Sequence, residues 1–143
     1  MKNFGKQVLV LVVSCFGVTA IAADFDGSKT LLCSFAQITE CDLGSECRAV
    51  TSESVDAPDF VKFDFKKKKI TAISAGVDTA PDDMDNVINL ASYVVVQGVQ
   101  GGAEGAADTF AWSATINHAT GLMVVTASGE NAGFVVFGAC TTI

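Results

Sequence analysis

The chain has 143 residues, half of which are hydrophobic, and its formal net charge at pH 7 is −7. This length fits one domain built around one hydrophobic core. A negatively charged chain repels phosphate backbones and anionic lipid surfaces, so nucleic acid is not expected as a partner.

The first residues predict an export signal. Lys2 and Lys6 accompany an apolar run that starts at Val8. The run ends in residues 20–22, Ala-Ile-Ala, which have the small-x-small pattern that signal peptidase accepts. We therefore expect residues 1–22 to be a cleaved signal peptide.

Cleavage would leave a single β-barrel or β-sandwich domain over residues 23–143, in the periplasm or secreted. It would remove two lysines and no acid, which changes the net charge from −7 to −9. An alternative is a lipid anchor at Cys15, but that cut would leave an apolar stretch on the mature side. The apolar run is too short for a stable membrane span, and no integral membrane span is expected elsewhere.

Four cysteines remain after cleavage, namely Cys33, Cys41, Cys47 and Cys140. Their spacing lacks the close C-x2-C pairs of a zinc site, and an even number in an oxidising compartment predicts two disulfides. If residues 31–41 form one extended strand, Cys33 and Cys41 lie about 26 Å apart, whereas a disulfide needs Cα atoms within roughly 7 Å. We expect Cys41–Cys47 across a hairpin loop, and Cys33–Cys140 between the first and last strands.

Short apolar alternation punctuated by turn residues predicts strands along the whole mature chain. Val61, Phe63 and Phe65 share one strand face, and Phe110, Trp112, Ala114 and Ile116 share another. One short helical turn is expected within residues 52–60. The expected strands lie at residues 31–41, 47–52, 60–65, 70–74, 86–91, 93–99, 110–116, 122–128 and 133–140.

These eight or nine short strands predict an all-β fold, an antiparallel up-and-down meander closed into a small calycin-like barrel, with a sandwich as the alternative. A disulfide between the first and last strands favours closure, which also removes exposed strand edges. Residues 133–140 are apolar on both faces, as is typical of a strand covered on both sides.

Two charged segments are candidate sites. Lys66–Lys69 predict a solvated hairpin turn, with a patch for an anionic partner as the alternative. Asp78, Asp82, Asp83 and Asp85 are weak calcium candidates, because clustered carboxylates bind calcium. Their segment lacks the glycine and the closing glutamate of an EF-hand, so no metal is expected and an exposed acidic connection is favoured.

Catalytic signals are sparse. The only histidine, His118, lies in a predicted turn, so no Ser-His-Asp arrangement is indicated. Gly98–Asp108 lacks the Lys-Ser/Thr of a phosphate loop and predicts a hairpin tip. We expect neither enzymatic activity nor a cofactor.

The segments DGSKTLLC near the start, VKFDFKKKKI in the middle and GFVVFGACT at the end resemble a family of short exported bacterial proteins of unknown function. The resemblance extends from about Phe25 to Thr141. It implies a periplasmic or secreted β-rich protein, and it carries over no activity and no site residues.

Three functions are compatible with these features. The favoured one is a non-enzymatic interaction or accessory module of the cell envelope, with a filled core and an unknown protein partner. The alternative is a carrier whose barrel holds a small hydrophobic ligand. The third, disfavoured one is a hydrolase with paired carboxylates.

Overall fold

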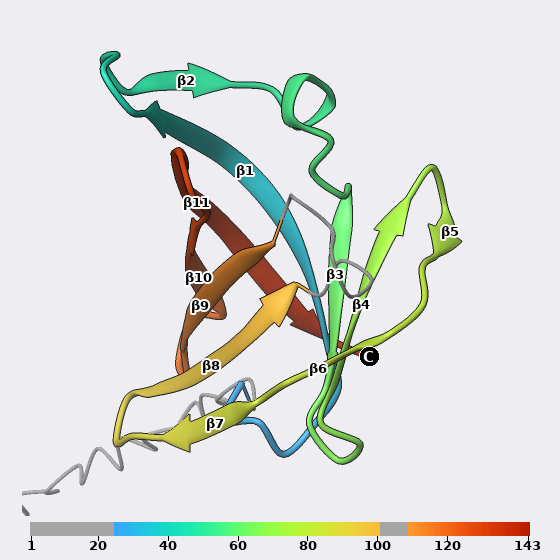
Figure 1. Ribbon diagram of the computed structural model, residues 1–143. Coiled ribbons are helices and arrows are strands. Elements are labelled where there is room, and N and C mark those ends of the chain that lie inside the picture. The colour runs from blue at the N-terminus through green and yellow to red at the C-terminus, as the bar shows by residue number, and fades with distance from the viewer. Residues whose placement is uncertain (1–24, 101–108) are drawn as a thin grey trace, which may run out of the picture.

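The computed structural model describes residues 25–100 and 109–143, which form strands and one short 3-10 helix (Figure 1). The predicted all-β class is confirmed. The elements are β1 (Leu31–Asp42), β2 (Arg48–Val50), η1 (Ser52–Val55), β3 (Phe60–Asp64), β4 (Lys69–Ser74), β5 (Val77–Asp78), β6 (Asp82–Asp83), β7 (Asn86–Asn89), β8 (Tyr93–Gln100), β9 (Phe110–Asn117), β10 (Leu122–Ser128) and β11 (Ala132–Thr142).

The strands form one antiparallel sheet in the order β5-β4-β3-β1-β11-β10-β9-β8-β7. Most strands pair with their neighbours in sequence, as a meander requires. β1 also pairs with β3, and β4 also pairs with β6, each past one short strand. The pairing of β1 with β11 connects strands from the two ends of the sequence and joins the two halves of the sheet. The prediction that the first and last strands are neighbours is therefore confirmed.

The sheet curls into an open half-barrel, so the predicted closed barrel is wrong. On one side of the opening, β4 pairs with the two-residue strands β5 and β6; on the other, β7 pairs with β8. The connection between these edges contains Pro81, which has no N–H to donate to a ladder, and a run of acidic residues. This segment crosses the opening without joining the edges through a continuous ladder (Figure 1).

Both predicted disulfides are present. Cys33 and Cys140 face each other in the β1–β11 ladder and are bonded across 107 residues of sequence. Cys41 and Cys47 are bonded across the turn between β1 and β2. Two such bonds are typical of a protein that folds in an oxidising, extracytoplasmic environment.

Each of the nine predicted strands corresponds to an observed one, and η1 provides the predicted helical turn. The count of eight or nine strands is too low, because β5 and β6 are too short to give a periodic signal. The expectation that residues 133–140 are covered on both faces is also wrong, because Phe137 is 45% exposed on the outer side of β11.

Within the described ranges, no helix is long and apolar enough to cross a membrane.

The lysine run forms the predicted hairpin turn between β3 and β4, with Lys66–Lys68 in the turn and Lys69 as the first residue of β4. Lys66, Lys67 and Lys68 are exposed. The Asp64 carboxylate accepts a hydrogen bond from the Lys67 N–H at 3.1 Å, and Lys69 forms an ion pair with Asp83 at 2.7 Å. The turn is held by local polar contacts, as expected of a solvated connection.

A tightly packed core occupies the end of the half-barrel that contains the N-terminal described residues. Its largest fully buried side chains are Phe63, Leu31, Ile116, Met123, Val94, Val96 and Cys33. Phe25 covers this core, and its ring lies so close to Gly121 that a Cβ there would be 2.7 Å away. Gly121 has a φ of +68°, a conformation that glycine adopts without strain.

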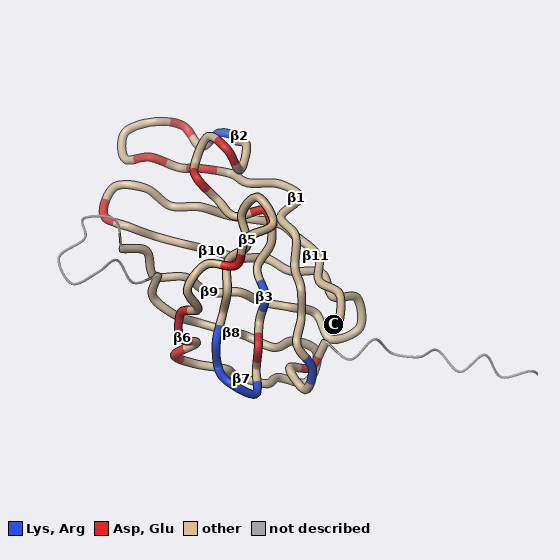
Figure 2. The backbone as a smooth tube through the Cα atoms, turned by 90° about the vertical axis from the view of Figure 1, so that its right-hand side faces the viewer, with Lys and Arg blue, Asp and Glu red and all other residues tan. Residues whose placement is uncertain are grey.

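Charged side chains are distributed unevenly over the sheet (Figure 2). The strands from β7 to β11 contain no Asp, Glu, Lys or Arg. The strands from β1 to β6 contain both signs of charge, as the colours of Figure 2 show. The sheet is thus half charged and half neutral.

Candidate functional site

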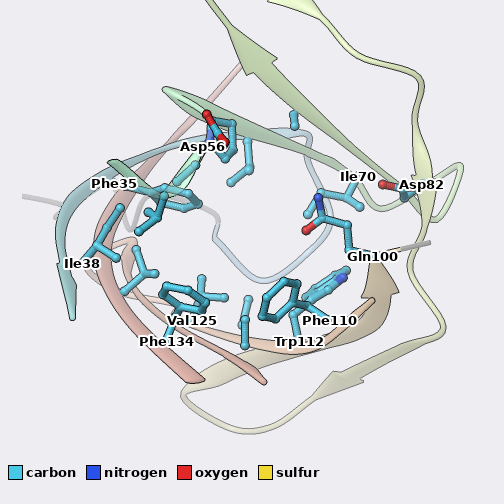
Figure 3. Close-up of a pocket in the computed structure, with 18 of the residues that line it drawn as sticks. Phe35, Ile38, Asp56, Ile70, Asp82, Gln100, Phe110, Trp112, Val125 and Phe134 are labelled. Carbon is cyan, nitrogen blue, oxygen red and sulfur yellow. The ribbon is translucent and has the colours of Figure 1, made fainter. Parts of the chain in front are cut away.

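A cavity of about 500 Å³ lies inside the half-barrel (Figure 3). Side chains from strands on every side line it, from β1 and β3 round to β8 and β11. The expectation of a filled interior is therefore wrong. The apolar side chains that shape the cavity most include Phe35, Ile38, Phe110, Trp112, Val125 and Phe134.

The cavity arises where small and large side chains alternate across the strands. Gly98, Trp112, Ala127 and Phe134 are consecutive cross-strand partners on β8, β9, β10 and β11. Directly opposed side chains in a ladder lie about 5 Å apart, so the two large rings flank the small Ala127. Trp112, Ala127 and Phe134 all line the cavity, and Figure 3 shows the Phe110 ring between Trp112 and Phe134.

A second row of cross-strand partners, nearer the packed core, has large side chains on three adjacent strands. Its cross-strand partners are Val94, Ile116 and Met123, followed by Gly138 on β11. The first three are fully or almost fully buried. Large aliphatic side chains on three adjacent strands fill this level, so the cavity narrows toward the packed core.

A β-bulge in β1 directs two bulky side chains into the cavity. The β1–β11 register shifts between Phe35 and Gln37, so Phe35 and Ile38 both face inward although three positions separate them. Gly138 lies opposite the bulge, where a Cβ would be 2.3 Å from the Ser34 carbonyl oxygen. The bulge therefore requires glycine at position 138, because any larger residue would clash with the backbone of β1.

Gly98 allows the Trp112 ring to lie flat against β8. A Cβ at this position would be 2.6 Å from the indole ring and 3.0 Å from the Asp83 carbonyl oxygen. The missing side chain thus admits both the tryptophan and the segment that crosses the opening. Trp112 is the only tryptophan of the chain, so its fluorescence reports on this cavity alone.

Aromatic contacts hold the walls. Phe110 and Phe134 meet edge to face with their ring centroids 5.6 Å apart, and Phe63 and Trp112 do so at 6.5 Å. Such pairs stabilise by about 1 kcal/mol beyond the area they bury. Figure 3 shows Phe134, Phe110 and Trp112 side by side along one wall of the cavity, with Phe35 across from them.

Polar side chains are few and lie on separate elements. Asp56 follows η1, Asp82 belongs to β6 beside Ile70, and Gln100 ends β8. Figure 3 shows Asp56 on the side of Phe35, and Asp82 on the side of Ile70. The described lining contains no Lys, Arg or His.

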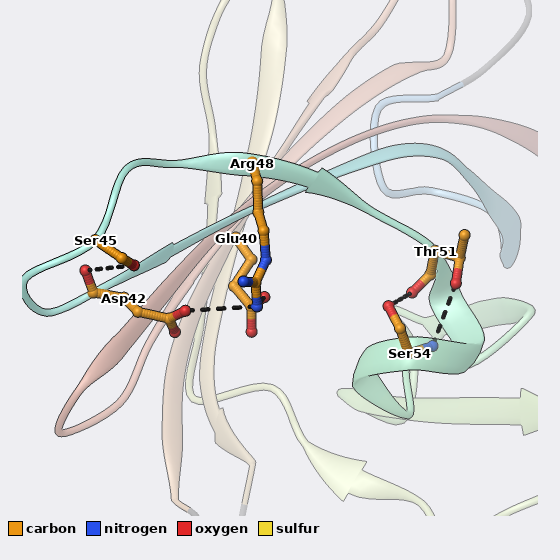
Figure 4. A network of polar contacts seen from close by, with 6 residues as sticks. All are labelled: Glu40, Asp42, Ser45, Arg48, Thr51 and Ser54. Carbon is orange, nitrogen blue, oxygen red and sulfur yellow. Dashed lines mark hydrogen bonds and ion pairs between the residues drawn. The ribbon is translucent and has the colours of Figure 1, made fainter.

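A polar network lies at the end of β1 that pairs with β2 (Figure 4). Arg48 donates a hydrogen bond to Glu40 at 2.7 Å and lies 3.6 Å from Asp42. The hydrogen bond to Glu40 raises the pKa of Arg48, so this guanidinium stays charged. Nearby, Thr51 caps η1 by accepting a hydrogen bond from the Ser54 N–H at 3.3 Å.

The calcium candidates are dispersed. Asp78 pairs with Lys62, Asp83 pairs with Lys69, and Asp82 lines the cavity. Asp85 is exposed just before β7. Across residues 25–100 and 109–143, no group of three or more potential ligands is arranged to hold a metal ion.

His118 lies in the β9–β10 turn, away from the cavity lining, and its Nε2 is buried without a hydrogen-bond partner in the described structure. Its backbone N–H donates to the Ser92 carbonyl at 3.0 Å. Nearby Asp26 has a lowered pKa, chiefly because the hydroxyl and backbone N–H of Ser28 donate hydrogen bonds to it.

The predicted hairpin tip over Gly98–Asp108 is placed only in part. Gly98–Gln100 belong to β8, and residues 101–108 lie outside the described residues, as does the predicted signal peptide.

Sequence reasoning identified the inward face of β9 but missed most of the cavity. Phe134 lies in a segment that is apolar on both sides, so periodicity could not orient it. The odd spacing of Phe35 and Ile38 within one predicted strand was the signal for the bulge. Asp56 and Asp82 had no signal linking them to a common site.

Comparisons of the chain with family models, with curated proteins and with solved structures found no match.

Proposed function

We propose that the protein is a non-enzymatic binding protein that holds a small hydrophobic molecule in its half-barrel cavity. The observation that carries this proposal is an apolar, aromatic-lined cavity of about 500 Å³. Ligand pockets typically have about 300–1,000 Å³, with mostly apolar walls and a few polar groups.

The architecture suits uptake and release. The sheet is open between β4–β6 and β7, so a ligand has a route that breaks no continuous ladder. The packed core below the cavity keeps the walls in place while the cavity is empty. Two disulfides suit a protein that works outside the cytoplasm. We propose that it acts in the periplasm or after secretion.

Native mass spectrometry of protein purified from the cells that make it tests the proposal. We expect a mass above that of the polypeptide, which returns to the polypeptide mass after denaturation. Ala127→Phe should abolish the added mass, because an additional ring on the cavity wall beside Trp112 and Phe134 occupies space that the ligand needs. Ala111→Phe is the matched control, since Ala111 is exposed on the outer face of β9. A bare polypeptide mass, together with no binding of the neutral dye N-phenyl-1-naphthylamine in solution, would refute the proposal.

A second candidate function is docking of a protein partner on the neutral outer face. Ile88, Val95, Thr115, Val124 and Phe137 are consecutive cross-strand partners over five strands. Ile88, Val124 and Phe137 are 46%, 38% and 45% exposed. An exposed apolar row without charges is typical of interaction surfaces.

A pull-down from cell-envelope extract tests this candidate. We expect one reproducible partner, which is lost with the double variant Val124→Thr/Phe137→Thr. Leu43→Thr is the control, because Leu43 is 84% exposed in the β1–β2 turn outside the row. Recovery of no reproducible partner would count against docking and would leave the cavity proposal unaffected.

A further inference from the structure

We propose that the cavity is selective for an amphiphile with a positively charged amine head and an apolar body. This inference rests on the proposed function and specifies the chemistry of its ligand. Two observations support it: the cavity lining contains two carboxylates and no basic side chain, and the basic side chains on adjoining strands form ion pairs elsewhere.

Both ionisable side chains in the described lining are carboxylates, Asp56 and Asp82. The described part of the chain gives neither carboxylate a side-chain hydrogen bond or an ion pair. Both are accessible to water in the empty protein, Asp56 being exposed and Asp82 half-buried. A cationic head group in the cavity can therefore contact the carboxylates of Asp56 and Asp82, which form no ion pair with another described side chain.

The basic side chains on adjoining strands are already paired with other acids. Lys69 lies next to Asp82 in the β4–β6 pairing, but its ammonium contacts Asp83 at 2.7 Å. Lys62 of β3 pairs with Asp78. Arg48 is held by Glu40 and Asp42. None of these three side chains lines the cavity, so none is placed to receive an anionic head.

The aromatic walls support the same selectivity. A cation over the face of a tryptophan or phenylalanine ring is attracted by the ring quadrupole, by about 0.5–2 kcal/mol depending on desolvation. Trp112, Phe110 and Phe35 line the cavity and provide such rings. A carboxylate head gains nothing from ring faces and is repelled by Asp56 and Asp82. Fatty acids are therefore disfavoured as ligands.

Three probes with the same chain, decylamine, decanol and decanoate, test the inference at pH 7 by titrating Trp112 fluorescence below their aggregation concentrations. We expect decylamine to bind at least tenfold more tightly than decanoate, with decanol in between. In the double variant Asp56→Asn/Asp82→Asn, the ratio of the amine and carboxylate dissociation constants should fall below about threefold. The affinity for decanol should not change.

A second double variant tests whether the preference for the amine comes from the cavity carboxylates or from the net negative charge of the whole protein. Asp85→Asn/Glu130→Gln removes the same number of charges outside the cavity lining. We expect it to keep the tenfold preference, and an equal loss in both double variants would overturn the inference. Equal binding of all three probes to the native chain would overturn the inference but leave the proposed function standing. Binding of none of them would overturn the inference, and together with a bare polypeptide mass and no binding of N-phenyl-1-naphthylamine it would also refute the proposed function.

Discussion

The same strands form a packed interior at one end of the half-barrel and a hollow interior at the other end. At the packed end, Val94, Ile116 and Met123 lie side by side on β8, β9 and β10, and each is at most 1% exposed. Four residues further along β9 and β10, the residues at corresponding inward positions are Trp112 and Ala127, and a cavity separates the walls. The backbone pairing continues through both levels.

The difference shows that side-chain volume, and not strand pairing, decides where this sheet is solid and where it is hollow. Three adjacent aliphatic side chains fill the space between strands, as in any close-packed interior. The row of Gly98, Trp112, Ala127 and Phe134 lies at the cavity, because glycine and alanine fill less volume than the side chains of the packed row. The packed end therefore contributes most to stability, and the hollow end provides the space for a ligand.

The largest effect is expected at the disulfide that joins the first and last strands. Cys33→Ser/Cys140→Ser should lower the free energy of unfolding by about 4–5 kcal/mol, because the bond closes a loop of more than 100 residues. Urea unfolding followed by circular dichroism measures the loss. Cys41→Ser/Cys47→Ser, which opens a much shorter loop, should cost about 2 kcal/mol. A larger cost for the short loop would show that the β1–β11 junction does not stabilise the fold.

The comparison of the two ends can be tested directly with identical substitutions. Val94→Ala at the packed end should cost about 2 kcal/mol, because it removes two methyl groups from a filled core. Val125→Ala faces the existing cavity and should cost less than about 1 kcal/mol. Equal costs in urea unfolding would mean that the cavity collapses in solution and that the ends do not differ.

Gly98 lies beside Trp112 at the hollow end. Gly98→Ala should destabilise the protein by about 1–2 kcal/mol, because the new methyl group overlaps the Trp112 ring and the Asp83 carbonyl. Displacement of the indole should also shift its emission maximum and weaken ligand binding. Ala111→Gly on the outer face of β9 serves as the control, and it should leave the emission maximum unchanged. An unshifted emission spectrum in Gly98→Ala would show that the ring does not rest against β8.

The smallest effect concerns pH and the β3–β4 turn at the packed end. The Lys67 backbone N–H lowers the pKa of Asp64, so the ionised carboxylate stabilises the folded state. This stabilisation is fully present above the unfolded pKa of about 3.9 and is lost as pH falls through the lower folded pKa. Asp64→Asn should lower the urea midpoint slightly at pH 7 and not at pH 2. A difference that persists unchanged at pH 2 would rule out ionisation as its cause.

Much of the secondary structure could be predicted because it depends on neighbouring residues. Alternation over Phe110–Ile116 and Val61–Phe63 correctly gave the inward faces of β9 and β3. The disulfides followed from the reach of an extended strand, which excludes a bond between Cys33 and Cys41. β5 and β6 were missed because strands of two residues have no period.

The candidate site was harder to predict. Trp112 was placed on the inward face, but Phe35 and Ile38 share the cavity only because a bulge changes the register of β1. Asp82 was considered as part of a calcium cluster, whereas the fold separates it from Asp78 and Asp83. Asp56 was not singled out, since nothing near it in sequence indicates that it borders a cavity.

By itself, the sequence determined the all-β class, the turns, the disulfide pairing and the acidic character of the chain, because these depend on local periodicity, chain reach and composition. Only the tertiary structure decided that the sheet stays open between β4–β6 and β7, and that its interior is packed at one end and hollow at the other. Both properties depend on the volumes of side chains brought together from distant strands, and a periodic pattern contains no information about which volumes will meet.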